Sequence, residues 1–112
     1  MNLNFQQLQC FVTVSETLNF STAAKRLHLS QPAVSKNIKQ LETELSFELF
    51  RRSQHEVSLT AAGLEFSKQM ANVLILTEQA IIDSREISEQ EKTSLKIGYT
   101  NAMIETVSYT HL

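Results

Sequence analysis

Apolar residues recur at helical spacing near the start of the chain. Leu8, Phe11 and Val12 would share the inner face of a helix over residues 4–17. A second, shorter helix is predicted to begin at Ser21, whose hydroxyl would cap free backbone N–H groups, and strong helix formers continue it through residues 23–27. The first part of the chain is therefore predicted to contain two amphipathic helices.

A third helix follows after a link of only three residues. Ser30 is its predicted N-cap, and Pro32 lies in the first turn, where a missing N–H removes no hydrogen bond. Apolar residues then return at spacings of four, three and four, namely Val34, Ile38, Leu41 and Leu45. Because so short a link keeps the second and third helices together, residues 20–45 are predicted to form a helix-turn-helix.

Two short runs of apolar and polar residues come next. Residues 49–52 and 56–59 flank Ser53, Gln54 and His55, which is typical of a two-stranded wing. Thr60 is then the predicted N-cap of a long helix that runs to about Ser88. The predicted fold is thus mainly α, a winged helix-turn-helix followed by a long helix.

The long helix carries more apolar surface than one small domain is expected to bury. Its main stripe follows alternating spacings of four and three, and further apolar residues widen it. We expect a dimer interface here, because exposed apolar area of this extent usually marks an interface. The alternative is a helix that packs only on its own domain. The residues predicted for the dimer interface are Phe66, Met70, Val73, Leu74, Thr77, Ala80 and Ile81.

The last part of the chain changes character. Residues 86–94 are mostly polar and are predicted to form a hinge, and residues 95–99 alternate as a strand does. Three regions are therefore expected: residues 1–59 as the winged domain, residues 60–88 as the long helix, and residues 89–112 as a hinge and strand.

Composition limits the function classes. The 112 residues include two glycines, one proline and no tryptophan, which favours a helical chain. No leader and no apolar run near the length of about 18 that a bilayer requires are evident, so we expect a cytoplasmic protein without a membrane segment. Cys10 is the single cysteine, and its apolar neighbours indicate a buried thiol. The three histidines are far apart, so no metal, cofactor or enzymatic activity is expected.

Charge is distributed unevenly along a chain whose net charge is −2. Residues 1–60 carry six cations and five anions, whereas the rest carries four cations and seven anions. No acidic residue lies between Glu16 and Glu42, yet that window holds four cations, Lys25, Arg26, Lys36 and Lys39. A one-signed helix pair of this kind indicates nucleic-acid binding, although a solvated face in a small bundle is the plainer alternative.

The outer face of the third helix offers two kinds of DNA contact. Gln31 can pair with adenine, Lys36 can donate to guanine, and Ser35 can reach several base edges. Lys39, with Ser21 and Thr22 at the start of the second helix, is better placed for phosphates.

The chain resembles the DNA-binding domain of LysR-type transcriptional regulators from residue 3 to about residue 90. The resemblance implies Gln31, Pro32, Ser35 and Lys36 at base edges and Arg52 in a wing that reaches the DNA backbone or minor groove. Ser46 and His55 depart from the family pattern, where glycine and a second wing arginine are common. The matching residues are Leu8, Phe11, Phe20, Ala23, Ala24, Leu27, Ser30, Gln31, Pro32, Ala33, Ser35, Ile38, Leu41, Glu42, Leu45, Leu49, Phe50, Arg52, Val57, Leu59, Thr60 and Gly63.

The resemblance also implies partners. A bacterial transcriptional regulator of this type binds double-stranded promoter DNA as a homodimer, and a tetramer is left open for a full-length protein. A small-molecule effector would bind a further domain, of which Thr100 would be an early contact residue and most would be missing. Residues 107–112, VSYTHL, match a reading frame through a transposon-end sequencing adaptor, so we hypothesise that they are not native. The alternative function is a helical protein–protein interaction module that does not read DNA.

Overall fold

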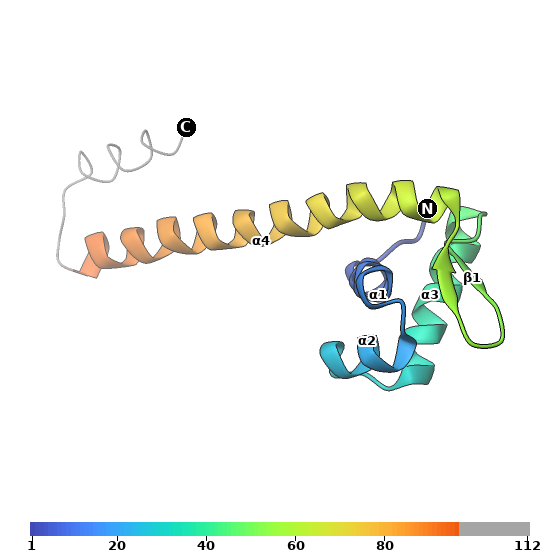
Figure 1. The fold of residues 1–112 in the computed structure, drawn as a ribbon. Helices are drawn as coiled ribbons and strands as arrows, with labels where there is room; N and C mark the ends of the chain where they lie inside the picture. Colours follow the sequence, from blue (N-terminus) through green and yellow to red (C-terminus); the bar gives the residue numbers. More distant parts are fainter. Residues whose placement is uncertain (97–112) are drawn as a thin grey trace. The chain divides into compact units, whose positions relative to one another are not determined.

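The computed structural model describes the backbone of residues 1–96 and the side chains of residues 1–93. The described residues divide into two compact units, Met1–Leu74 and a second that begins at Ile75, and each is considered by itself. Thr100, residues 107–112 and most of the predicted strand lie outside the described residues. The elements, drawn in Figure 1, are α1 (Phe5–Thr17), α2 (Phe20–Leu27), α3 (Gln31–Leu45), β1 (Phe50–Arg52), β2 (Val57–Leu59) and α4 (Ala61–Lys96).

Helix α1 begins with a capping box. The Oδ1 of Asn4 accepts from the backbone N–H of Gln7 at 2.8 Å, and Gln7 returns the interaction by accepting from the N–H of Asn4 at 3.2 Å. Two otherwise free donors are satisfied in this way, which fixes where the helix starts. The helix ends at Leu18, which adopts the left-handed conformation with φ 50°.

The start of α2 differs from the prediction. Asn19, not Ser21, is the N-cap, and its Oδ1 accepts from the N–H of Thr22 at 2.9 Å. The helix begins one residue before Ser21 because Phe20 must lie in the helix to bury its ring in the core, where it is only 8% exposed. Asparagine and serine both cap well, so the apolar residue between them decides which one does.

Helix α3 begins as predicted, with Ser30 accepting from the N–H of Ala33 at 3.2 Å and with Pro32 in the first turn. The helix ends at Ser46, which adopts the left-handed conformation with φ 64° and donates its N–H to the carbonyl of Glu42 at 2.9 Å. This is the position at which glycine is preferred, since glycine adopts that conformation without steric penalty.

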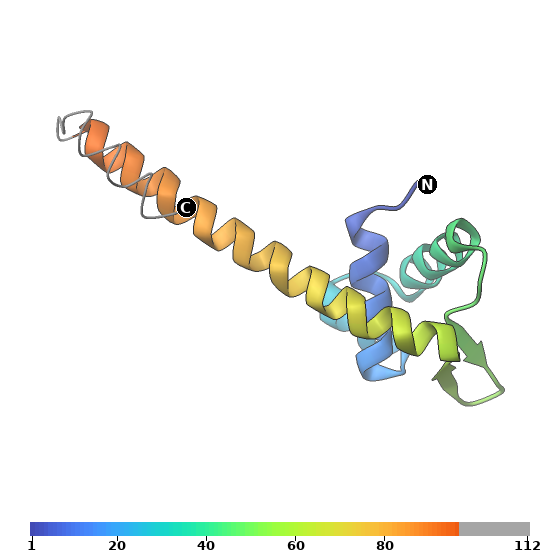
Figure 2. The same cartoon turned by 90° about the horizontal axis from the view of Figure 1, so that it is seen from above.

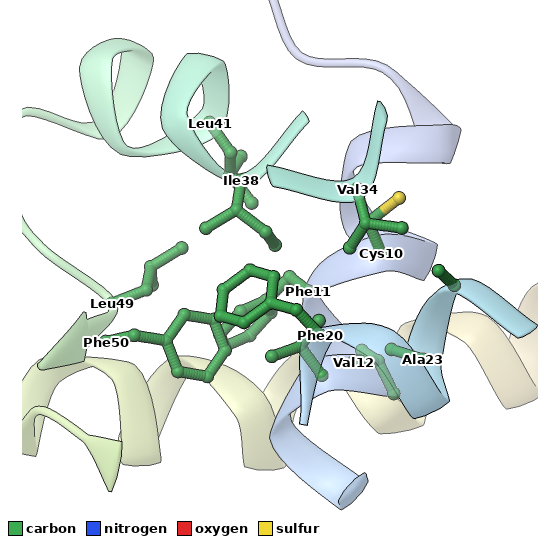
Figure 3. Close-up of a cluster of buried hydrophobic side chains, with 12 residues drawn as sticks. Cys10, Phe11, Val12, Phe20, Ala23, Val34, Ile38, Leu41, Leu49 and Phe50 are labelled. Carbon is green, nitrogen blue, oxygen red and sulfur yellow. The ribbon is translucent and has the colours of Figure 1, made fainter. Parts of the chain in front are cut away.

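The core of the first unit lies where α1, α2, α3 and the wing meet. The ring of Phe11 lies at its centre, 5.5 Å from Phe50 and 5.3 Å from Phe66, so α1 joins the wing to α4. Figure 3 shows the rings of Phe11, Phe20 and Phe50 together. Cys10 is fully buried, as predicted, and burial raises the pKa of its thiol. The other fully buried large side chains are Val14, Val34, Ile38, Leu41 and Leu49.

The predicted wing is confirmed as an antiparallel hairpin. Phe50 pairs with Leu59 and Arg52 with Val57, each strand being slightly shorter than the pattern predicted. The hairpin is tied to α3 through Glu42, whose Oε2 accepts from the N–H groups of Leu49 at 2.7 Å and Phe50 at 3.3 Å. A carboxylate that accepts two backbone donors holds the wing strand against the helix.

Thr60 joins the end of the wing to the start of α4. Its hydroxyl donates to the carbonyl of Glu48 at 2.7 Å and accepts from the N–H of Gly63 at 2.9 Å, so the predicted cap is confirmed. Glycine is required at position 63, because a Cβ there would overlap the carbonyl oxygen of Leu49. Viewed from above, the first turns of α4 cross α1 (Figure 2).

Helix α4 is longer than the pattern predicted. It continues to Lys96, through the segment 89–94 for which polar composition predicted a hinge and through the first two residues of the predicted strand. That prediction was wrong because the segment contains no glycine or proline to end a helix. Glutamate, glutamine and lysine are themselves strong helix formers, so a polar run of them can extend a helix.

Candidate nucleic-acid interface

The two faces of α3 differ sharply. Val34, Ile38 and Leu41 are fully buried, which fixes the rotation of the helix about its axis. The opposite face carries the residues predicted to meet DNA. Gln31, Pro32, Lys36 and Lys39 are exposed, and Ser35 is half-buried. An amide, a hydroxyl and two ammonium groups are thus presented from one side of the helix.

Two of the grooves beside this face are lined by the predicted DNA-contacting cations. The first has a volume of about 670 Å³ and separates the start of α1 from α3. The second, of about 530 Å³, lies between α3 and the wing and contains Arg51 and Arg52. Lys39 lines both grooves, which suits a side chain that follows a phosphate backbone better than one that reads a base. The first groove is lined by Asn2, Asn4, Gln7, Lys36, Lys39, Gln40, Thr43 and Glu44.

Ser21 and Thr22 are both exposed in the first turn of α2. Their hydroxyls remain on the surface as predicted, but the backbone N–H of Thr22 already donates to Asn19. Helix geometry leaves the N–H groups of Phe20 and Ser21 without an intrahelical acceptor. The phosphate contacts of α2 would therefore come from these N–H groups and the hydroxyls, and the free N–H groups lie two residues earlier than a Ser21 cap implied.

Arg52 is exposed on β1, and its side chain also contacts a residue of α2. Its Cζ lies 4.5 Å from the centroid of the Phe20 ring, a cation–π contact that joins the wing to α2. Arg51 is also exposed and borders the groove beside α3. Arg51 was not among the residues predicted to contact DNA, although its position next to Arg52 in the predicted wing could have indicated such a contact.

The cations of the first unit are mostly not neutralised by nearby carboxylates. Within the described residues, its salt bridge is the one between Arg26 and Glu16, with 3.1 Å between Nη1 and Oε2. Both side chains are more than half exposed, so solvent screens the pair and it adds little stability. Within the described residues Lys36, Lys39, Arg51 and Arg52 form no salt bridge, although Glu44 lines the first groove and Glu42 and Glu48 line the second.

Other kinds of site find no support in the described part of the chain. None of its side chains form a group of three or more histidine, cysteine, aspartate or glutamate residues that could hold a metal ion. None of its helices is long and apolar enough to cross a membrane.

The residues predicted for the dimer interface fall into two groups. Phe66, Met70 and Leu74 pack against the core of their own domain, as the alternative interpretation held for the whole helix. Val73 is exposed by 38%, and in the second unit Ala80 and Ile81 are exposed and Thr77 is half-buried. The second unit also exposes Ile75, Leu76 and Ile82, which widen the apolar surface of the helix beyond the predicted main stripe.

Comparison with known proteins agrees with this geometry. Residues 5–64 match the family described as bacterial regulatory helix-turn-helix protein, lysR family. The regulator ClcR of Pseudomonas putida is 37% identical over 102 residues, which are 91% of this chain and 35% of ClcR. The chain thus spans about a third of the length of ClcR, and about the same share of the regulators YnfL of Escherichia coli and BsdA of Bacillus subtilis. These relatives are transcriptional regulators, which agrees with the expectation that the chain is not an enzyme.

Two solved structures of DNA complexes are similar to the chain. The CbnR DBD in its DNA complex is 37% identical with a TM-score of 0.72, over 77% of this chain and 99% of that one. The BenM DBD with catB site 1 DNA is 30% identical with a TM-score of 0.74, over 77% and 97% of the two chains. The chain therefore belongs to the lysR family of bacterial regulatory helix-turn-helix proteins, and its first unit has the family's winged helix-turn-helix fold.

Proposed function

We propose that this chain binds double-stranded promoter DNA sequence-specifically and that the protein is a bacterial transcriptional regulator. The observation that carries the proposal is the division of α3, whose inner face is fully buried while Gln31, Lys36 and Lys39 are exposed on the outer face. A helix held so firmly from behind presents its polar face in a fixed orientation to the major groove. The similarity to DNA complexes of CbnR and BenM supports the same use of α3.

Within this surface we assign different roles to different residues. Gln31, Ser35 and Lys36, with Pro32 beside them in the first turns of α3, contact base edges, because an amide, a hydroxyl and an ammonium group can read the major groove. Lys39, Arg52, Ser21 and Thr22 contact the phosphate backbone and set the orientation of the domain. Arg51 joins this second group, since it borders the same groove as Lys39 and Arg52.

We further propose that the protein acts as a homodimer through α4. Ile75 and Leu76 are exposed by 62% and 68%, and Ile81 and Ile82 by about half, so the described part of the second unit offers apolar surface to a partner. A second copy is the occupant we favour, because two recognition helices can read two half-sites together. Of the predicted interface, Val73, Thr77, Ala80 and Ile81 are retained, whereas Phe66, Met70 and Leu74 are already used by their own domain.

Further expectations concern the whole protein and remain proposals. They are a cytoplasmic location, an effector bound through a further domain near Thr100, and a tetramer as a larger assembly.

The direct test is binding to duplex DNA at several salt concentrations, after bound sequences have been selected from a random duplex pool. Affinity should fall steeply as salt rises, because cations that neutralise phosphates release counterions. A selected duplex should also bind more tightly than a scrambled one of the same length. If the chain binds no duplex even at low salt, the alternative of a protein–protein interaction module replaces this proposal.

A further inference from the structure

The contact between Arg52 and Phe20 joins an exposed side chain to a buried ring. Burial of apolar surface alone therefore does not explain it. We propose that Phe20 is a positioning residue for DNA binding. Its ring holds the guanidinium of Arg52 against α2, so that the wing and α2 contact the same stretch of the DNA backbone. The inference rests on the proposed DNA-binding function and concerns how the wing takes part in it. Its geometric basis is the distance of 4.5 Å between the Arg52 Cζ and the centroid of the Phe20 ring.

The Phe20 ring is fixed from behind. It is only 8% exposed, and it meets the ring of Phe50 edge to face, with 6.1 Å between centroids and 67° between planes. Phe50 in turn packs on Phe11 at the centre of the core, as Figure 3 shows. The ring face that meets Arg52 therefore has a defined position relative to both the wing and α1.

Arg52 is suited to being held by such a ring. Its side chain is exposed, and within the described residues it forms no salt bridge that would compete for its charge. A guanidinium can stack its plane on an aromatic ring and still direct N–H donors outward, which a lysine ammonium cannot do. The ring thus restricts the side chain without consuming the donors that a phosphate needs.

The place at which Arg52 is held also fits. Phe20 is the residue before Ser21 and Thr22, whose exposed hydroxyls are assigned to phosphate contacts. An arginine anchored on Phe20 is held at the first turn of α2, the turn that also carries these hydroxyls. Phosphates approached by α2 and by the wing would then belong to one continuous stretch of DNA backbone.

A double-mutant cycle on the whole chain tests the inference. Phe20→Leu keeps an apolar side chain but removes the ring face, Phe20→Tyr keeps the ring, and Arg52→Ala removes the cation. On a mixed-sequence duplex at low salt, Phe20→Leu should weaken binding by about two- to fivefold, the range expected for an exposed cation–π contact. Phe20→Tyr should bind like the wild type. In the Arg52→Ala background, Phe20→Leu should have no further effect, because there is no longer a guanidinium to position.

Additive effects of Phe20→Leu and Arg52→Ala would overturn the inference, since they would mean that the ring acts only through the core. A second measurement is independent of DNA and of any loss of stability in Phe20→Leu. The side-chain protons of Arg52 should show an upfield ring-current shift by NMR in the wild type and in Phe20→Tyr. Absence of that shift in the wild type would also overturn the inference. A wild-type chain that binds no duplex would instead remove the proposed function, and this inference with it.

Discussion

Gln31 is the exposed residue best able to distinguish one base pair from another. It lies in the first turn of α3, and its amide can donate to and accept from adenine at once. Gln31→Ala should cost about 1–3 kcal/mol of binding free energy on a selected site and relax the preference at one base position. Competition among duplexes that differ at single positions would measure this. An equal loss on every duplex would contradict the base-reading role.

Lys39 should behave in the opposite way, although it lies on the same helix. It lines both of the grooves described above, where a cation can contact phosphates of the DNA backbone. Lys39→Ala should weaken all duplexes similarly and reduce the slope of log affinity against log salt by about one. Lys25→Ala is the matched control, because Lys25 is an exposed cation of α2 that lines neither groove. If Lys25→Ala changes the slope as much as Lys39→Ala, general charge rather than position accounts for the effect.

Ser46 carries a backbone conformation that its side chain does not favour. With φ 64° it ends α3 in the left-handed region, where a Cβ is crowded by the neighbouring carbonyl oxygen. Ser46→Gly should therefore raise the free energy of unfolding by about 0.5–1 kcal/mol, which thermal or urea denaturation would detect. Ser46→Ala keeps the Cβ and should give no such gain. A stabilised alanine variant would mean that the serine hydroxyl, not the backbone, is unfavourable.

At the scale of elements, the wing depends on one carboxylate of α3. Glu42 accepts from the N–H groups of Leu49 and Phe50, both of which are buried residues. Glu42→Ala should lower the free energy of unfolding by about 1–3 kcal/mol, because two buried donors lose their acceptor. Glu42→Gln keeps one acceptor oxygen and should lose less. Denaturation of the three proteins under the same conditions would give the order.

Glu48→Ala is the control for this carboxylate. Glu48 is exposed and lies between α3 and the wing, and only its backbone carbonyl, which the substitution keeps, is bonded to Thr60. Its removal should change stability by no more than about 0.5 kcal/mol. If Glu48→Ala and Glu42→Ala destabilise the protein equally, loss of negative charge rather than loss of the two hydrogen bonds is the cause.

The elements were predictable from sequence to the extent that local signals agreed with packing. The apolar spacing of α3, its Ser30 cap and Pro32 all indicated one start, and the structure has that start. At α2 the local signal failed, because the choice between Asn19 and Ser21 depends on the burial of Phe20 by distant parts of the chain. The predicted end of α4 was wrong for a different reason. Polar composition alone does not end a helix, and the polar residues in this segment favour helix.

The exposure of the candidate site's residues was predictable from the sequence, whereas the contacts that join them to other elements were not. Exposure of Gln31, Lys36 and Lys39 follows from the apolar spacing on the other face of the same helix. The tie from Glu42 to the wing and the contact of Arg52 with Phe20 join residues that are distant in sequence. No periodicity within one element can reveal such pairs, because they arise only when the hairpin folds onto the helices.

For the whole molecule, we assign DNA reading to the first unit and the pairing of two copies to the second. The first unit has a complete core, centred on Phe11 and closed by α4 residues such as Phe66. Over its described residues the second unit is the remainder of α4, and it exposes most of its apolar side chains. One recognition helix reads too few base pairs to be selective, whereas two linked copies read both half-sites. Specificity should therefore depend on residues that never touch DNA.

Substitutions in the second unit should separate pairing from folding. Ile75→Asp or Ile81→Asp would place a charge on surface that we expect a second copy to cover. Either should weaken dimerisation at least about tenfold, equivalent to roughly 1.4 kcal/mol, without lowering the melting temperature of the winged domain. Gln90→Asp introduces the same charge at an exposed polar position of α4 away from these isoleucines and should leave the dimer intact. Sedimentation equilibrium measures the association. Phe66→Ala should instead destabilise the winged domain itself, because the ring of Phe66 packs on Phe11. A wild-type chain that remains monomeric at high concentration would refute the pairing of α4, whereas dimers that persist in both aspartate variants would move the interface to another face of the helix.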